Sequence, residues 1–286
     1  MSRFREKLAS GKFLVTADLV YPGGPDTGPL LKAVMTLRTR VDAFHITWDG
    51  EPLMAIAPLS LAHHLMGKGV EPILQFTSNA RGPVELQKEL LNTFVMGVKN
   101  LLFVDGGEGS RVSVDALTLV EGATGLNLLM THGPRRRAID PLCVGVTVDS
   151  EAADLENEVR RMERMAQEGA SFFQARPTFD PGAFDRFISR VENIGAPVFA
   201  SIVPLRSASM ARRFRELMPS VHLPEEIIRE LEESRDPGRA GIEIAARLLR
   251  ELKEICVGVR VMAAGWEDNI TKVLAESGLT PPRRWS

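Results

Sequence analysis

Short apolar runs alternate with segments of helical period from one end of the chain to the other. The runs are rich in β-branched and aromatic residues, which favours extended structure, and they span 13–20, 43–48, 72–77, 100–105, 143–148, 172–174, 197–203 and 258–264. Apolar residues recur at three- and four-residue spacing over the intervening segments 29–38, 60–68, 84–98, 152–168, 208–218, 224–234, 238–254 and 267–277. A weaker helical pattern covers 115–122. Strands that alternate with helices in this way are typical of a parallel sheet.

Eight such strands in 286 residues match a (β/α)8 TIM barrel in number and size. We therefore predict one barrel domain over residues 1–286, with extra helices before the last strand. A doubly wound open sheet is the rival architecture. That architecture usually needs fewer strands, and no Gly-x-Gly-x-x-Gly fingerprint follows the first predicted strand.

Composition narrows the function classes. A net charge of −2 gives no general electrostatic attraction to nucleic acid or to an anionic membrane. The two cysteines, Cys143 and Cys256, lie in apolar strand-like runs and are expected as buried free thiols. Neither a signal peptide nor a run long enough to span a membrane is apparent, so the cytoplasm is the expected compartment.

The predicted carboxyl ends of the strands carry polar and small residues, which is where a βα-barrel places its ligands. These ends contain Asp18, Thr47, Gln75, Thr77, Asp105, Gly106, Gly107, Thr147, Gln174 and Arg176. Histidines with metal-ligand spacing beside carboxylates are missing, as is a Gly-x-Ser-x-Gly elbow, so we expect neither a metal site nor a serine nucleophile. The chemistry is therefore expected to come from an organic cofactor.

Several motifs, in order along the chain, resemble those of the methylenetetrahydrofolate reductase family. The segment 16–24 is similar to that family's first-strand Glu-x-x-Pro-Pro-Arg-Gly, and 42–47 is similar to its Asp-Ala-x-Asn-Val-Thr. The segments 71–81 and 86–100 resemble its third strand and following helix, and 172–180 resembles Phe-x-x-Thr-Gln-Pro-x-Phe-Asp. The segments 241–246 and 258–262 resemble its closing helix and strand. The resemblance thus covers nearly the whole chain.

The resemblance implies a flavin-dependent oxidoreductase of one-carbon metabolism that reduces 5,10-methylenetetrahydrofolate to 5-methyltetrahydrofolate. It implies FAD as cofactor, a folate substrate, and a nicotinamide nucleotide or a protein as electron donor. Asp18 matches the family's catalytic acid. The positions that match flavin contacts are Thr47, Gln75, Thr77, Asp105, Gly106, Gly107, Thr147, Arg161 and Arg164. The positions that match substrate contacts are Gln174, Arg176 and Met210.

The chain departs from the family pattern mainly at the folate end. Asp18 replaces a glutamate and is one methylene shorter, and Gly106-Gly107 stands where the family has Gly-Asp. Asp105 and Glu108 are alternative sources of the carboxylate expected there. Arg176 replaces a pterin-binding glutamine and donates only, so it suits a carboxylate or a phosphate better than an amide edge.

These departures leave three hypotheses open. The first is a methylenetetrahydrofolate reductase with an altered site. The second is a paralogue that binds folate or flavin without reducing the folate, as a subunit of a methyl-transfer or electron-transfer complex. The third is a barrel that has lost flavin. A homo-oligomer or a partner subunit fits any of them.

Overall fold

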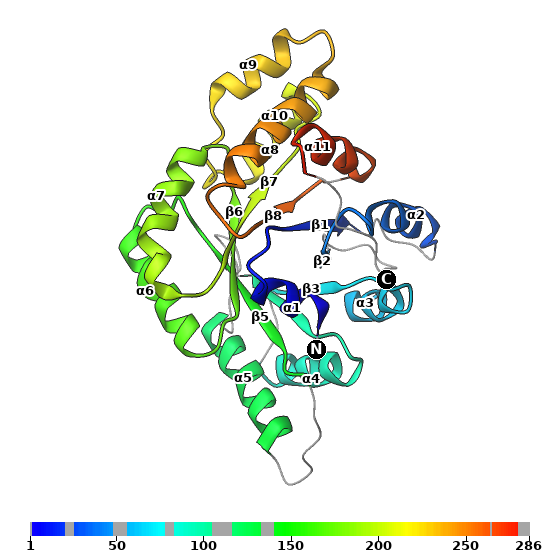
Figure 1. Ribbon diagram of the computed structural model, residues 1–286, viewed down its shortest axis with the longest axis vertical. Helices are drawn as coiled ribbons and strands as arrows, with labels where there is room; N and C mark the ends of the chain where they lie inside the picture. The colour runs from blue at the N-terminus through cyan, green and yellow to red at the C-terminus, as the bar shows by residue number, and fades with distance from the viewer. Residues whose placement is uncertain are drawn as a thin grey trace.

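The computed structural model describes residues 2–20, 26–47, 56–77, 83–104, 116–132, 140–263 and 265–279. Eight parallel strands close into a barrel in the order β1 to β8 (Figure 1). They are β1 (Leu14–Val20), β2 (Ala43–Thr47), β3 (Pro72–Thr77), β4 (Asn100–Val104), β5 (Cys143–Val148), β6 (Phe172–Pro177), β7 (Val198–Ile202) and β8 (Gly258–Val261). Pairing of Leu14 with Gly258 and of Ala17 with Val261 joins the first strand to the last. The predicted TIM barrel is confirmed.

Helices surround the barrel (Figure 1). They are α1 (Arg3–Ala9), α2 (Gly28–Leu37), α3 (Pro58–Met66), α4 (Pro83–Val95), α5 (Ala116–His132), α6 (Leu155–Gln167), α7 (Pro181–Val191), α8 (Ala208–Leu217), α9 (Glu225–Glu233), α10 (Pro237–Leu252) and α11 (Ile270–Glu276), with short 3₁₀ turns η1 (Glu192–Ile194) and η2 (Glu267–Asn269). The extra helices predicted before the last strand are α8 to α10.

Helices α1, α5 and α7 and strand β6 differ from the sequence-based expectation. The helical pattern was expected to end near Gly122, but α5 continues to His132. Beyond Gly122, Ala123 is buried, and Asn127 donates to the Leu142 carbonyl and accepts from the Leu142 N–H, which holds this part of the helix beside β5. Helices α1 and α7 were not among the predicted elements. Strand β6 runs to Pro177 rather than Gln174.

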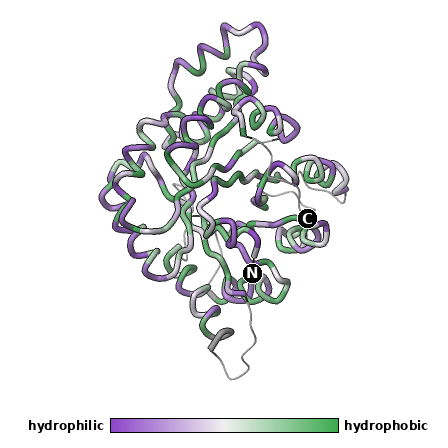
Figure 2. Tube along the Cα trace, in the orientation of Figure 1, coloured by the Kyte–Doolittle hydropathy of each residue, from purple (hydrophilic) through white to green (hydrophobic). Residues whose placement is uncertain are grey.

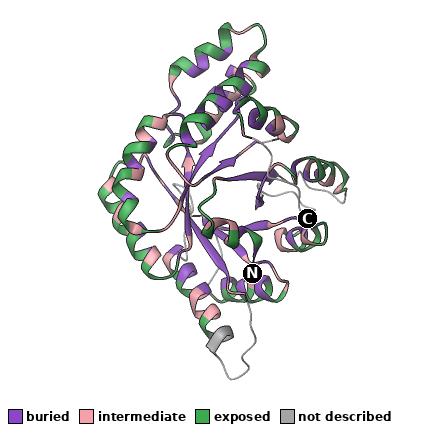
Figure 3. Cartoon of the chain, in the orientation of Figure 1, coloured by how far each residue is buried: buried purple, intermediate pink, exposed green. Residues whose placement is uncertain are grey.

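Side chains alternate between the two faces of each strand and form two separate apolar clusters. The larger cluster lies between strands and helices and includes Val15, Ala17, Phe44 and Phe173. The smaller one fills the barrel at the amino ends of the strands and includes Leu14, Phe172 and Phe199. The strands are accordingly buried, while the helices expose their outer faces (Figures 2 and 3).

Helix α1 closes the amino end of the barrel. Phe4 is fully buried, and its ring centroid lies 5.4 Å from that of Phe172 and 5.9 Å from that of Phe199. Gly145 makes room for this aromatic layer, because a Cβ at that position would lie 2.2 Å from the Phe172 ring. Apolar packing therefore fills this end and leaves the carboxyl ends for polar groups.

Strand β6 separates from β7 near its carboxyl end. The pairing register shifts between Gln174 and Pro177, as in a β-bulge. Side chains bridge the gap: Gln174 Nε2 donates to the Ala200 carbonyl at 3.0 Å, and Ser201 Oγ donates to the Ala175 carbonyl at 2.6 Å. The irregularity lies directly beside Arg176, one of the predicted substrate contacts.

Candidate active site at the carboxyl ends of the strands

Asp18 lies inside the barrel and is bound by Arg260, which was not among the predicted site residues. It shares a strand face with Leu14, which belongs to the interior cluster. Arg260 of β8 donates from Nε to Asp18 Oδ1 at 2.6 Å and from Nη2 to Oδ2 at 2.8 Å. Asp18 is 4% exposed and Arg260 is 6% exposed. The two form a bidentate, water-excluded ion pair.

His45 lies beside this pair, opposite Asp18 in the β1–β2 register. It is fully buried, and its Nε2 lies 3.0 Å from Thr16 Oγ1. Burial lowers the pKa of His45 well below its usual 6.5, and the positive charge of Arg260 lowers it further. The imidazole is therefore neutral at physiological pH and is unsuited to supply a proton.

Three buried polar atoms in this part of the chain have no hydrogen-bond partner among the described residues: His45 Nδ1, Gln75 Nε2 and Gln174 Oε1. Buried polar atoms are nearly always paired, with protein, water or ligand. All three belong to β2, β3 and β6, and two of these residues, Gln75 and Gln174, are predicted ligand contacts. These atoms leave hydrogen-bonding capacity inside the barrel for small molecules.

The structure describes the other predicted flavin contacts only in part, because some of these residues or their side chains lie outside the described part of the chain. Thr47 and Thr77 end β2 and β3, and only their main chain is described. Asp105, Gly106 and Gly107 lie outside the described residues, as does Glu108. Thr147 is half-buried near the end of β5, next to the helix that carries the predicted arginines.

Arg161 of α6 makes protein contacts instead of facing solvent. It donates from Nε to Glu158 Oε2 at 2.8 Å, from Nη2 to Glu158 Oε1 at 2.7 Å, and from Nη2 to the Thr147 carbonyl at 2.9 Å. Glu158 Oε1 also accepts from the Asp149 backbone N–H at 2.8 Å. Arg164, one turn later, is exposed. The structure thus uses Arg161 to fix the start of α6 to β5.

Arg176 lies at the end of β6, next to the bulge. Its Nη1 donates to Asp149 Oδ2 and to Ser220 Oγ, each at 3.0 Å. Its side chain is 34% exposed, so it lies at the edge of the barrel mouth. The structure brings Arg176 and Gln174 together on one strand face. Met210, in the first turn of α8, packs against the outer apolar cluster instead.

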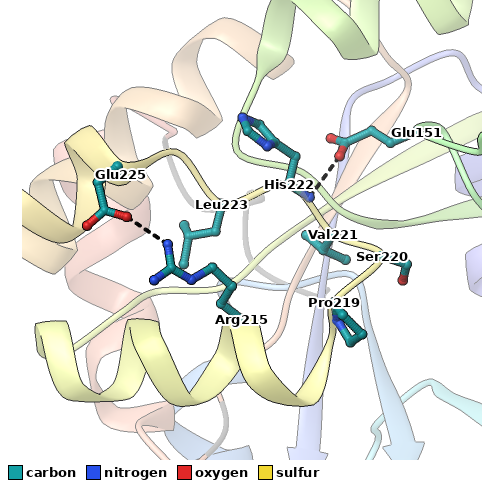
Figure 4. A pocket seen from close by; sticks show the side chains of 8 residues that line it. All are labelled: Glu151, Arg215, Pro219, Ser220, Val221, His222, Leu223 and Glu225. Atoms are coloured by element: carbon teal, nitrogen blue, oxygen red, sulfur yellow. Dashed lines mark hydrogen bonds and ion pairs between the residues drawn. The ribbon is translucent and has the colours of Figure 1, made fainter.

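A cavity of about 560 Å³ lies beside Arg176, between the α8–α9 connection and the end of β5 (Figure 4). Glu151 Oε2 accepts from the His222 backbone N–H at 3.0 Å, and Arg215 Nη1 donates to Glu225 Oε2 at 2.7 Å. Burial raises the pKa of Glu151 above its usual value. The cavity is lined by Glu151, Arg215, Pro219, Ser220, Val221, His222, Leu223 and Glu225.

Some of these residues could have been found in the sequence and others could not. Arg260 interrupts the apolar run 258–264, and a charge inside a predicted buried strand is a signal for a buried partner. No sequence pattern indicates Ser220 or His222, because they reach the site through the fold of the α8–α9 connection. In the described ranges, no three His, Cys, Asp or Glu side chains are grouped as a metal site would require.

The comparisons with known proteins agree with this architecture. The sequence model described as methylenetetrahydrofolate reductase matches residues 3–278, nearly the whole chain. No curated protein matches the sequence significantly. Within the described residues, no helix has the length and apolar character needed to cross a bilayer.

Solved structures share the fold at low sequence identity. A phosphonopyruvate hydrolase aligns with a TM-score of 0.57 at 12% identity, over 96% of this chain and 85% of its own. A 2,3-dimethylmalate lyase aligns with a TM-score of 0.55 at 16% identity, over 97% and 87%. A tryptophan synthase from M. tuberculosis aligns with a TM-score of 0.53 at 12% identity, over 96% and 92%. At such identities the likeness indicates the barrel fold alone.

Proposed function

Because the chain belongs to the methylenetetrahydrofolate reductase family, over residues 3–278, we propose that it is a flavin-dependent oxidoreductase that interconverts 5,10-methylenetetrahydrofolate and 5-methyltetrahydrofolate. Family membership by itself indicates a folate-related reductase-type function. The finer proposal rests mainly on the polar interior at the carboxyl ends of β1, β2, β3 and β6. This polar region lies next to the apolar layer that includes Phe4, Phe172 and Phe199 at the amino end of the barrel. That arrangement offers hydrogen bonds where a βα-barrel binds its ligands.

FAD is the cofactor we propose, and the described residues fit it in part. Gln75 has a buried amide nitrogen without a partner, which suits a carbonyl or ring nitrogen of an isoalloxazine. Arg164 is exposed on α6, where it is accessible to a phosphate. When bound, a flavin supplies hydride transfer, which no amino-acid side chain can carry out.

Arg161 has a different part in this proposal. Its guanidinium donates to Glu158 and to the Thr147 carbonyl, so we propose that it also positions the β5–α6 connection beside the cofactor. Gln174 and Arg176 would face the substrate, since both extend from the interior face of β6. The electron donor, a nicotinamide nucleotide or a reduced protein, would meet the flavin from the same open end of the barrel.

The test is an anaerobic visible spectrum of the FAD-reconstituted protein, before and after addition of 5-methyltetrahydrofolate. We expect a yellow protein that bleaches, because the folate reduces the flavin in the reverse direction. A colourless protein after reconstitution would contradict the flavin proposal. A yellow protein that stays yellow would contradict the folate reaction while leaving flavin binding intact.

A second candidate function is favoured by one specific observation. Arg260 donates hydrogen bonds to both oxygens of Asp18. The residue that matches the family's catalytic acid is therefore bound on both oxygens by a cation. A paralogue that binds folate and flavin within a larger complex would tolerate this change. Steady-state turnover with methylenetetrahydrofolate and a chemical donor of electrons separates the two, since the paralogue would bind the folate without reducing it.

A further inference from the structure

Asp149 supplies, from within the protein, the kind of anion that the sequence favoured as a ligand of Arg176. We propose that Asp149 is a positioning residue that sets substrate specificity through Arg176. By pairing with the guanidinium, Asp149 lets Arg176 donate to an uncharged acceptor of the substrate and disfavours an anionic one. This inference rests on the proposed function, in which Arg176 faces the folate. The acceptor is then a carbonyl oxygen or a ring nitrogen of the pterin.

Two acceptors fix one end of the Arg176 guanidinium. Its Nη1 donates to Asp149 Oδ2 and to Ser220 Oγ, each at 3.0 Å, so both N–H groups of Nη1 are engaged. The N–H groups on Nε and Nη2 make no hydrogen bond to a described residue. The side chains of Arg176 and Asp149 are 34% and 22% exposed, so a ligand at the barrel mouth can reach the pair.

Asp149 is held in place by the backbone around it. Its Oδ1 accepts from the Glu151 backbone N–H at 3.0 Å, which is an Asx turn. Its own backbone N–H donates to Glu158 Oε1 at 2.8 Å. The carboxylate therefore presents Oδ2 to Arg176 whether or not a ligand is bound. An anionic group of a substrate would have to compete with this preformed partner.

Other arginines near the ends of β5 and β6 are paired in the same way. Arg161 Nη2 lies 2.7 Å from Glu158 Oε1, and Arg215 Nη1 lies 2.7 Å from Glu225 Oε2. An incoming anion thus meets cations that already have carboxylate partners, and it is repelled by those carboxylates. An uncharged acceptor avoids this repulsion and needs only the N–H donors.

The decisive variant is Asp149→Asn, which removes the charge and keeps the size of the side chain. Arg176 then lacks its ionic partner, and we expect inorganic phosphate to bind it about fivefold more tightly than in the wild type. The affinity is measured by titrating phosphate against the nitrogen-15 NMR signal of Arg176 Nε, which is assigned with Arg176→Gln. This measurement needs neither folate nor flavin.

Ser220→Ala is the matched control. It removes the other acceptor of Nη1, at the same distance, and leaves the ion pair with Asp149 intact. Its affinity for phosphate should stay at the wild-type level. In the folate half-reaction, phosphate should compete with the folate in Asp149→Asn, and Arg176→Gln in the same background should remove that competition. Loss of structure alone would not produce such a gain of binding.

Equal phosphate affinities in the wild type and in a folded Asp149→Asn would overturn the inference, as would an equal gain in Ser220→Ala. If Asp149→Asn does not fold, the wild type decides. Its Arg176 signal should shift with 5-methyltetrahydrofolate and stay in place with millimolar phosphate. A wild-type signal that shifts with phosphate would refute the role of Asp149.

These measurements also separate this inference from the proposed function. If the protein does not react with folate, the reductase proposal fails, and the phosphate titration still tests the effect of Asp149 on Arg176. If the wild type oxidises 5-methyltetrahydrofolate but its Arg176 signal does not respond to the folate, the reductase proposal stands and this inference is wrong.

Discussion

Polar side chains inside the barrel are matched to partners on neighbouring strands. Asp18 of β1 pairs with Arg260 of β8, and Gln174 of β6 binds the backbone of β7. Each pair removes part of the cost of burying a polar group. The sequence indicated Asp18 and Gln174 as site residues, but their partners are not neighbours in sequence. Asp18 and Arg260 are 242 residues apart, and local patterns do not encode which side chains meet where β1 and β8 close the barrel.

Replacement of Gln174 by leucine tests the side-chain hydrogen bonds between β6 and β7. The change leaves the Ala200 carbonyl and the Ser201 hydroxyl without the amide donor, so we expect a loss of about 1 to 2 kcal/mol in the free energy of unfolding. Urea denaturation measures it. Gln167→Leu, at an exposed position of α6, is the control and should change stability by less than about 0.5 kcal/mol. Equal effects at the two positions would contradict the role of Gln174.

Cys143 gives a pH-dependent prediction. It is fully buried among the interior apolar residues, and burial raises the pKa of its thiol to about 11. The thiol of the unfolded chain ionises first, so stability should be retained below about pH 8.5 and fall as pH rises from there towards 11. The total loss is roughly 3 kcal/mol, at about 1.4 kcal/mol for each unit of the pKa difference.

The measurement for Cys143 is urea denaturation across this pH range, compared with Cys143→Ala. The variant should lack the component of the alkaline loss that comes from the thiol. If both proteins lose stability in parallel, the thiol is not the titrating group.

At the scale of elements, helix α6 shows why a helical face alone does not identify a binding site. Arg161 and Arg164 have the spacing of one face, yet Arg161 is half-buried and Arg164 is exposed. The difference comes from Glu158, which is 8% exposed and binds both Arg161 and the backbone of Asp149. The periodicity predicted the helix correctly but could not indicate which of its charges turn towards the sheet.

Glu158→Ala should therefore destabilise the protein. The change leaves Arg161 and the Asp149 N–H without their acceptor, which we expect to cost about 2 kcal/mol in the free energy of unfolding. Glu156→Ala is the matched control on the same helix, because Glu156 is 73% exposed and its bridge to Arg160 is 3.6 Å long. That control should lose less than about 0.5 kcal/mol. A result in the reverse order would show that α6 is held mainly by its apolar face.

For the whole molecule, the order and number of strands followed from the sequence because each strand is a separate apolar run. The barrel's closure and the three helices before β8 were predicted on this basis. Helix α1 was not, because its segment is short and charged, and only Phe4 is buried within it. The site was predicted less completely than the fold, since Ser220 and His222 reach it through tertiary packing and the partner of Arg260 lies on a distant strand.

The apolar layer that includes Phe4, Phe172 and Phe199 closes the amino end of the barrel, and it gives a prediction about the free energy of unfolding. Phe4→Ala removes a fully buried ring that contacts Phe172 and Phe199, and we expect a loss of about 3 to 5 kcal/mol. Thermal and urea unfolding measure the change. Leu8→Ala, on the same helix, should cost clearly less because Leu8 is only partly buried. A small effect at Phe4 would mean that α1 docks without contributing to the core.

The position of this apolar layer also has a consequence for folding during synthesis. Phe4 leaves the ribosome before the rings that receive it, which belong to β6 and β7, and the partner that closes β1 is β8. The segment that carries Phe4 must therefore wait, unburied, until β6, β7 and β8 have been synthesised. A nascent chain arrested before β6 would expose Phe4 and the open edge of β1 together, and so would depend on chaperones that bind apolar segments.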